Sequence, residues 1–131
     1  MTPPGVTGDR DPSERLALAA ARAADDKGAT AVMVLRVGPV LGICEFFVLA
    51  SAANDRQVKA VVDAVQERVR DDVGQKPRSV EGADGRRWVL IDYGDVVVHV
   101  FHAEEREYYR IERLYADAPT LAWQPGRPTG S

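Results

Sequence analysis

The side chains whose spacing could do chemistry lie between residues 88 and 102. Asp92 and Asp95 flank Tyr93-Gly94, and His99 follows on the same segment. Carboxylates clustered on strands can hold the two metal ions of a nucleotidyltransferase. Here the aspartates flank a turn instead of lying two apart on one strand, so they match such a site poorly. Because of this poor match, a metal-dependent, nucleotidyltransferase-like enzyme acting on nucleotides is only the alternative function.

Other catalytic and metal-binding patterns are missing from the sequence. The only histidines, His99 and His102, are three residues apart and point to opposite faces of one strand, and Cys44 is the only cysteine. A zinc site needs several well-spaced ligands of these types. There is no Gly-x-Ser-x-Gly elbow and no phosphate-binding glycine loop. We therefore expect no metal site, whereas composition alone leaves a Ser-His-Asp arrangement open.

The segment 88–102 is predicted to be a β-hairpin, because both arms are rich in β-branched and aromatic residues. A two-residue loop at Tyr93-Gly94 would place Asp92 opposite Asp95 and Trp88 opposite His99. Alternation then gives one purely aliphatic face, made of Val89, Ile91, Val96, Val98 and Val100. The other face is mixed and carries Trp88, Leu90, Asp92, Asp95, Val97, His99 and Phe101.

The mixed face is the first candidate for a working surface. Opposed carboxylates repel each other, and an aromatic anchor beside an acidic rim is typical of interaction surfaces. Such a rim would suit a partner rich in arginine or lysine. A purely structural explanation stays open: aspartates beside turns often bond nearby backbone amides, and Trp88 and Phe101 could pack under a helix.

Length and composition indicate one soluble globular domain. The chain has 131 residues, 45% hydrophobic and 28% charged, with a formal net charge of −3. That charge argues against a direct DNA binder. No apolar run is long enough to span a membrane, and no apolar signal segment precedes residue 11. A single cysteine fits a reducing compartment, so the cytoplasm is expected.

Periodicity predicts the order helix, strand, strand, helix, weak strand, strand, strand, helix, in an α+β fold with a mixed β-sheet flanked by helices. The second helix is the clearest: Asn54 caps it, Gln57 takes the reciprocal capping position, and Gly74 ends it. The other elements are expected as a helix from Asp11 to Lys27, strands at 31–37, 45–51, 77–81 and the two hairpin arms, and one helix from Glu104 to Tyr115.

Both ends are predicted to be disordered, over residues 1–10 and 118–131, because prolines and glycines interrupt any periodic pattern there. The ordered domain then spans residues 11–117. Trp123 in the C-terminal tail is either a free side chain or a docking anchor. The alanine-rich first helix is expected to pack closely on the sheet or on another chain, which makes it one candidate dimer surface.

Several motifs resemble the ribosomal silencing factor family, also called Iojap-like, over Leu16 to Ala116. They are Trp88-x-x-x-Asp92-Tyr93-Gly94-Asp95-Val96-x-Val98-His99-Val100-Phe101, Glu105-Arg106-x-x-Tyr109-x-x-Glu112-x-Leu114-Tyr115, Phe47-Val48-Leu49-Ala50-Ser51 with Asp55-Arg56-Gln57-Val58-Lys59-Ala60, and Glu81-Gly82. There are departures: Cys44-Glu45-Phe46-Phe47 stands where the family usually has Asp-Tyr-Phe, and Ala52 follows Ser51 where glycine is frequent.

The resemblance implies a nucleotidyltransferase-like fold without enzymatic activity, in a small homodimer, so no catalytic residues and no cofactors are expected. It implies binding to the large ribosomal subunit through ribosomal protein fourteen of that subunit. This would sterically block joining of the small subunit and repress translation when nutrients are scarce. Carried over by motif, the candidate contacts are Trp88, Asp92, Tyr93, Asp95 and His99, with Arg56 and Glu81 as weaker candidates.

Overall fold

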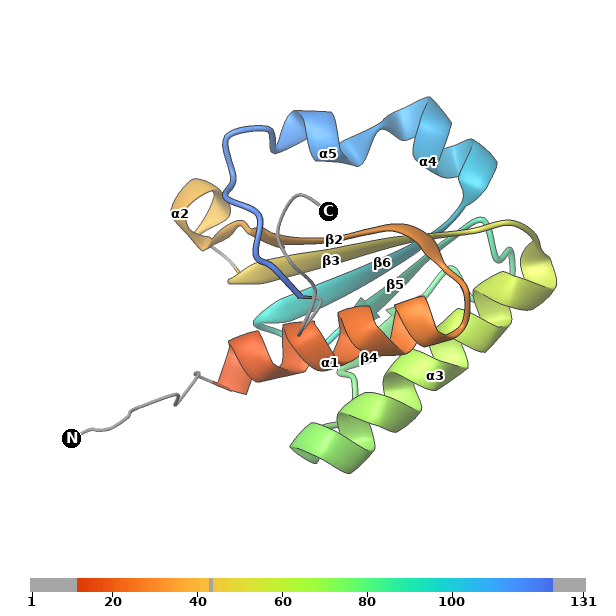
Figure 1. Cartoon of the computed structure of the whole chain (residues 1–131), viewed down its shortest axis with the longest axis horizontal. Helices are drawn as coiled ribbons and strands as arrows, with labels where there is room; N and C mark the ends of the chain where they lie inside the picture. Colours follow the sequence, from red (N-terminus) through yellow and green to blue (C-terminus); the bar gives the residue numbers. More distant parts are fainter. Residues whose placement is uncertain (1–11, 43, 124–131) are drawn as a thin grey trace.

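Five strands form one mixed sheet in the computed structural model, which describes residues 12–42 and 44–123 (Figure 1). They are β2 (Thr30–Arg36), β3 (Phe46–Ala52), β4 (Ser79–Glu81), β5 (Trp88–Asp92) and β6 (Val96–His102). Their spatial order is β2-β3-β6-β5-β4, with β3 and β6 parallel and the other neighbours antiparallel. The predicted α+β class with a mixed sheet between helices is confirmed. The nucleotidyltransferase-like part of that prediction remains a prediction.

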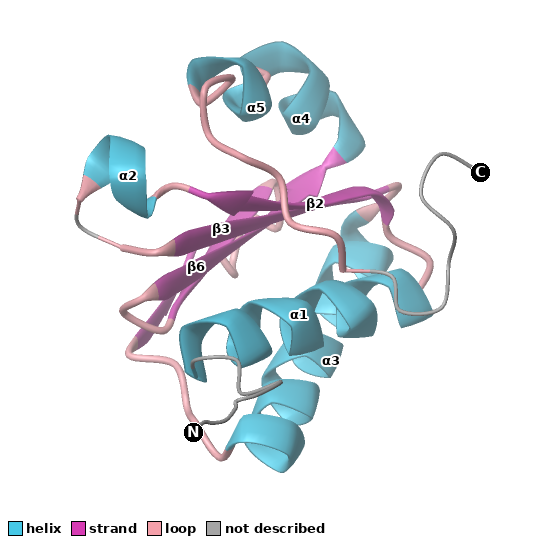
Figure 2. Cartoon of the chain, turned by 60° about the vertical axis from the view of Figure 1, so that its left-hand side comes forward, coloured by secondary structure: helices cyan, strands magenta, loops and turns pink. Residues whose placement is uncertain are grey.

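Two long helices, α1 (Pro12–Asp26) and α3 (Asp55–Val73), cover one face of the sheet (Figure 2). The core on this face contains the alanines of α1 and the valine stripe of α3, which consists of Val58, Val61, Val62, Val65 and Val69. Ala20 is completely buried within its own chain. The suggestion that these alanines form a dimer surface is therefore wrong; their small side chains let α1 lie close to α3 and β3.

Helix α3 begins and ends where its sequence signals place it. The Gln57 backbone N–H donates to Asn54 Oδ1 over 2.9 Å, and Gly74 adopts a left-handed φ of 76° after the last turn. The Gln57 side chain reaches back to accept from the Ala53 N–H. These contacts satisfy backbone groups that a helix end leaves without intrahelical partners.

The opposite face carries three short helices: α2 (Gly38–Leu41), α4 (Ala103–Tyr109) and α5 (Ile111–Leu114). The single last helix predicted from Glu104 to Tyr115 is wrong, because Arg110 has a left-handed φ of 48° that ends α4 and redirects the chain. In one continuous helix Tyr108 and Ile111 would lie on the same face, and the break at Arg110 separates them. Ile111 is buried, whereas Tyr108 is 80% exposed.

Residues 119–123 run beside β2, so the prediction that the whole of 118–131 is disordered is wrong for this part. The Arg36 N–H donates to the Pro119 carbonyl, and the Leu121 N–H donates to the Val34 carbonyl, each over 2.8 Å. Trp123 is a docking anchor on its own chain, since its indole N–H donates to the Val32 carbonyl. Residues 1–11, including the predicted cap Asp11, and residues 124–131 lie outside the described residues.

Within residues 12–42 and 44–123, no helix combines the length and apolar character that a membrane crossing requires.

Candidate functional site

The hairpin of β5 and β6 turns at Gly94-Asp95, one residue later than predicted. The Tyr93 N–H donates to the Val96 carbonyl over 2.9 Å, and Asp92 pairs with Val97 in the ladder. Gly94, with φ 92°, is the first central residue of the turn, a position where hairpins favour glycine. The predicted opposition of Asp92 with Asp95, and of Trp88 with His99, is therefore wrong: Trp88 lies opposite Phe101.

The predicted division of the hairpin into two faces is confirmed for the strand residues despite this shift, because moving the pairing by two residues keeps each of their side chains on its face. Asp95, predicted on the mixed face, lies in the turn instead. The five aliphatic residues, Val89, Ile91, Val96, Val98 and Val100, are at most 1% exposed and belong to the core shared with α1 and α3. The mixed face therefore lies on the side of the sheet that carries α4 and α5 (Figure 1).

Trp88 and His99 form the polar contact of this mixed face. The Trp88 indole N–H donates to His99 Nδ1 over 3.2 Å, so His99 helps to orient the Trp88 ring. The Trp88 ring also lies 4.8 Å from that of Phe101, centroid to centroid. His99 itself is 5% exposed and packs edge-on against Phe47. The indole is thus held from two sides while part of it stays accessible.

Burial controls the charge of His99. Loss of solvent, with a smaller effect from the positive charge of Arg106, lowers the pKa of His99 to about 4. The imidazole is therefore neutral at physiological pH, so its Nδ1 is free to accept from Trp88. Its second nitrogen, Nε2, is buried without a hydrogen-bond partner.

A half-exposed strip runs along the hairpin from Trp88 through Leu90 and Val97 to Asp92; we call these four residues the hairpin strip. With strand residues about 3.3 Å apart, it is roughly 13 Å long. Asp92 Oδ1 accepts the Gly94 N–H over 2.7 Å, as aspartates beside turns often do. Exposed Asp95 accepts from the Ser13 hydroxyl and adds a second carboxylate at this end.

Tyr93, predicted to be a contact at the turn, lies in the core. It is 4% exposed on the aliphatic face, and burial raises its pKa to about 12. Its hydroxyl is buried without a hydrogen-bond partner. An unpaired buried hydroxyl costs stability, so Tyr93 contributes packing and no accessible polar group.

Replacing Tyr93 with phenylalanine is expected to raise the free energy of unfolding by about 1 kcal/mol, because it removes a desolvated hydroxyl and keeps the ring. Urea unfolding at pH 7 measures this. Tyr93→Leu is the comparison, since it also removes the ring and should destabilise the protein. A Tyr93→Phe protein less stable than wild type would contradict the buried, unpaired hydroxyl.

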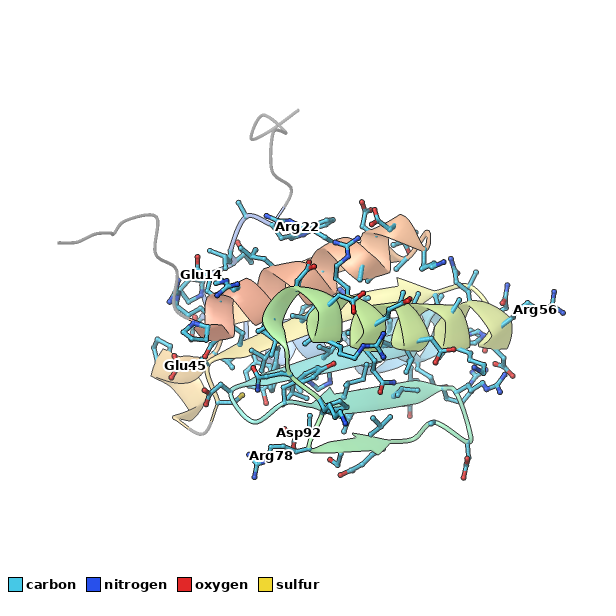
Figure 3. All side chains as sticks on the ribbon, turned by 90° about the horizontal axis from the view of Figure 1, so that it is seen from below. Glu14, Arg22, Glu45, Arg56, Arg78 and Asp92 are labelled. Carbon is cyan, nitrogen blue, oxygen red and sulfur yellow. The ribbon has the colours of Figure 1, made fainter. Side chains whose placement is uncertain are left out.

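The weaker candidates, Arg56 and Glu81, lie apart from the acidic end of the strip. Exposed Arg56 begins α3 and lines a shallow pocket with His102, and Figure 3 places it at the far end of the molecule from Asp92. Glu81 is exposed on β4, where its ladder partner is Leu90. The structure therefore groups Trp88, Asp92, Asp95 and His99 along the hairpin, with Glu81 on the neighbouring strand.

Arg106 is a buried residue to which the sequence assigned no role, although it belongs to the Glu105-Arg106 motif. Its guanidinium donates to Glu112 over 2.9 Å, to the Ser51 hydroxyl over 2.9 Å and to the Ala31 carbonyl over 3.0 Å. It also lies over the ring of Phe101. Arg106 therefore ties α4 and α5 to β2 and β3 above the mixed face.

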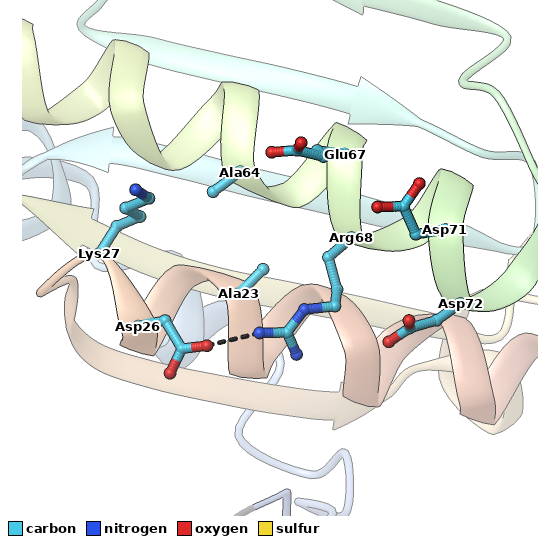
Figure 4. Close-up of a pocket in the computed structure, with 8 residues that line it drawn as sticks. All are labelled: Ala23, Asp26, Lys27, Ala64, Glu67, Arg68, Asp71 and Asp72. Atoms are coloured by element: carbon cyan, nitrogen blue, oxygen red, sulfur yellow. Dashed lines mark hydrogen bonds and ion pairs between the residues drawn. The ribbon is translucent and has the colours of Figure 1, made fainter.

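A second concave feature lies on the opposite side, in a groove of about 360 Å³ between α1 and α3 (Figure 4). Its charged lining consists of Asp26, Glu67, Asp71 and Asp72 with Lys27 and Arg68, and Arg68 is paired with Asp26. Carboxylates thus outnumber cations, which disfavours an anionic ligand such as a nucleotide. Among the described residues there is no group of three side chains able to hold a metal ion.

The fold and the hairpin define a class: an α+β domain that presents a half-exposed aromatic and acidic strip on one sheet face. Comparison with known proteins names the family. The model of the family "Ribosomal silencing factor during starvation" matches residues 10–129. This chain belongs to that family.

Individual relatives agree with the family match. A Bacillus subtilis protein named a ribosomal silencing factor is 41% identical over 100 residues, covering 76% of this chain and 84% of that protein. The crystal structure of a Bacillus halodurans protein is similar with a TM-score of 0.71 and 37% identity, covering 83% of this chain and 98% of that one. A Chromobacterium violaceum crystal structure gives a TM-score of 0.75 and 30% identity, covering 88% and 96%. Membership indicates a ribosome-associated regulator of translation.

Proposed function

We propose that this protein represses translation by binding the large ribosomal subunit through its ribosomal protein fourteen, where it blocks association with the small subunit. We propose further that it acts in the cytoplasm as a homodimer, especially when nutrients are limiting. The mechanism is steric occlusion, so it requires a tight surface contact and no chemical step.

The hairpin strip is the observation that carries this proposal. It combines an aromatic side chain held in one orientation, two aliphatic residues and a carboxylate in a continuous, half-exposed surface. A fixed, partly buried tryptophan loses little conformational entropy on binding, and such residues dominate the energy of protein interfaces. Trp88 is therefore the anchor of the strip, and its neighbours on the mixed face hold the indole in position.

Charge favours a basic partner at the turn end of the strip. Asp92, Asp95 and Glu45 all lie close enough to Cys44 that their charges, together with burial as the larger cause, raise the pKa of its thiol. A local cluster of carboxylates attracts arginine and lysine side chains and speeds encounter with them. A ribosomal protein surface rich in these residues fits that requirement.

The enzyme alternative has no comparable support. One oxygen of Asp92 is occupied by the turn, and the groove between α1 and α3 carries more carboxylates than cations. Metal-dependent nucleotide binding by the pure protein, measured by calorimetry, would favour this alternative if ribosome binding failed.

Replacing Trp88 with alanine is expected to weaken binding to isolated large subunits at least about 30-fold, the effect of losing an interface anchor worth about 2 kcal/mol. Co-sedimentation with large and small subunits at moderate salt measures it, with circular dichroism as the folding check.

Trp123→Ala is the matched control, because it removes another partly buried indole, bonded through its N–H, beside the edge strand β2. It should bind like wild type. If both variants bind equally well, the contact surface lies elsewhere. If wild type binds neither subunit, the proposed function is wrong for this protein.

A further inference from the structure

A groove of about 320 Å³ lies between α3 and the hairpin of β4 and β5, and we call it the β4 groove. Its floor is apolar and consists of Val58, Val62, Val80 and Val89. Val80 pairs with Ile91 in the sheet, so the β4 groove lies on the aliphatic face that α3 covers. The hairpin strip is on the other face, and the β4 groove is therefore a separate surface.

The strand beside this groove has an open edge. Within residues 12–42 and 44–123, β4 has a strand neighbour on one side only, and it forms the lower edge of the sheet in Figure 3. Backbone groups of alternate residues point to opposite sides of a strand, and Leu90 and Asp92 bond β4 because their neighbours in β5 bond β6. Ser79 and Glu81 therefore face β5, whereas Val80 directs its N–H and its carbonyl outwards. Such an edge can pair with an extended chain.

Arg86 is held partly buried beside the same groove. Its left-handed φ of 53° costs energy outside glycine, and its N–H donates to the Gly82 carbonyl over 3.1 Å. Gly82 is required in that turn, because a Cβ there would collide with the Trp88 carbonyl. The turn that begins with the Glu81-Gly82 motif thus fixes the position of Arg86. Among the described residues, the Arg86 guanidinium has no hydrogen-bond or ion-pair partner.

Arg86 is also the charge that a ligand in this groove would feel most strongly. The other charged residues of the lining are exposed, and two of them, Lys59 and Asp63, pair with each other over 2.7 Å. The third, Asp84, lies in the turn, where water surrounds it. Water and salt screen exposed charges more than partly buried ones. A guanidinium without a partner binds a carboxylate well, through two parallel N–H donors.

An extended peptide with one apolar and one acidic side chain matches these features. In antiparallel addition, the peptide residue opposite Val80 exchanges both backbone hydrogen bonds with it, and its side chain lies on the same face as Val80, over the groove. The residue two positions earlier is about 7 Å further along the same face, towards the turn that carries Arg86. The matching sequence is therefore acidic-x-apolar, where x is any residue.

We propose that the β4 edge and its groove bind an extended acidic-x-apolar segment of another protein as an added strand, with Val80 pairing its backbone and Arg86 its carboxylate. The proposal does not depend on ribosome binding, since the hairpin strip lies on the opposite face of the sheet.

The test is a titration of the full chain with the acetylated and amidated peptide Thr-Glu-Thr-Ile-Thr-Thr, followed by the NMR shift of the Val80 amide. Two matched peptides separate the contacts. Replacing the glutamate with lysine should weaken binding at least about fivefold, the effect of a partly buried ion pair. N-methylation of the isoleucine keeps its side chain but removes its N–H, and it should also weaken binding at least about fivefold.

Variants of the protein locate the carboxylate. Arg86→Gln should weaken binding of the glutamate peptide about fivefold and remove its advantage over the lysine peptide. Arg87→Gln is the matched control, since its guanidinium is already paired with Glu104 and Glu105, and it should bind like wild type.

Three results would overturn the proposal. The first is no shift of the Val80 amide at peptide concentrations up to about 5 mM, which covers weak binding. The second is equal binding of the N-methylated peptide, which would show that the groove takes an apolar acid without strand pairing. The third is equal binding of the glutamate and lysine peptides to wild type, a comparison that does not require any variant to fold.

Discussion

Replacing Arg106 with alanine is expected to lower the free energy of unfolding by about 3 kcal/mol, the low end of the range for breaking a buried ion pair on one side, because Glu112 is partly exposed. The Arg106 side chain is 8% exposed, and its removal leaves Glu112, the Ser51 hydroxyl and the Ala31 carbonyl without their donor. Ala31 has a left-handed φ of 50°, a conformation that costs energy outside glycine. Arg106 helps to hold that conformation, so its loss should also loosen the start of β2.

Urea unfolding of the variant measures this loss, and Arg110→Ala is the matched control. Arg110 also pairs with a glutamate, Glu107, but both side chains are largely exposed, and such pairs contribute about 1 kcal/mol or less. Arg106→Lys should recover only part of the loss, because one ammonium cannot reproduce the planar set of donors. Equal effects of the two alanine substitutions would contradict the role assigned to Arg106.

Local signals account for the parts of the fold that the sequence predicted well. Asn54, the valine stripe and Gly74 mark α3 within its own residues, so no distant contact was needed to place it. The two faces of the hairpin follow from the alternation of residue types along each strand, because that alternation reflects which side of the strand is buried. Its register depends on where the turn begins, and Gly94 can take a left-handed conformation at either position of a two-residue loop. The prediction therefore placed the strand residues on the correct faces and paired them with the wrong neighbours, whereas Asp95, predicted on the mixed face, lies in the turn and bonds Ser13 of α1.

Contacts between residues far apart in the sequence account for the parts of the fold that the sequence did not predict. Arg110 is not a residue type that normally ends a helix in a left-handed conformation, and nothing near it in the sequence predicts the break between α4 and α5. The composition of the C-terminal tail favours disorder, yet Trp123 finds a carbonyl on β2, 91 residues away. Among the candidate site residues, burial separates Tyr93 from Trp88, although both belong to one motif.

Lowering the pH should destabilise the protein through His99. Its pKa is about 4 in the folded chain and 6.5 in the unfolded chain, so the unfolded state binds a proton first as the pH falls. His99 therefore gives its full contribution to stability above pH 6.5, and the contribution is lost as the pH falls towards 4. A shift of this size corresponds to roughly 3 kcal/mol, of which about 2 kcal/mol should be lost between pH 7 and pH 4.5.

His99→Asn isolates this effect, because its amide oxygen can replace Nδ1 as the acceptor for Trp88 without titrating. Unfolding free energies at pH 7 and pH 4.5 give the loss for each protein. Carboxylates contribute to both, including Glu112, whose pKa burial raises but hydrogen bonds from its own backbone and Arg106 lower overall. The asparagine protein should therefore lose about 2 kcal/mol less than wild type over this interval. Equal losses in wild type and His99→Asn would show that His99 contacts water or another hydrogen-bond partner in solution. The neutral imidazole would then not be the group that holds the Trp88 indole in place.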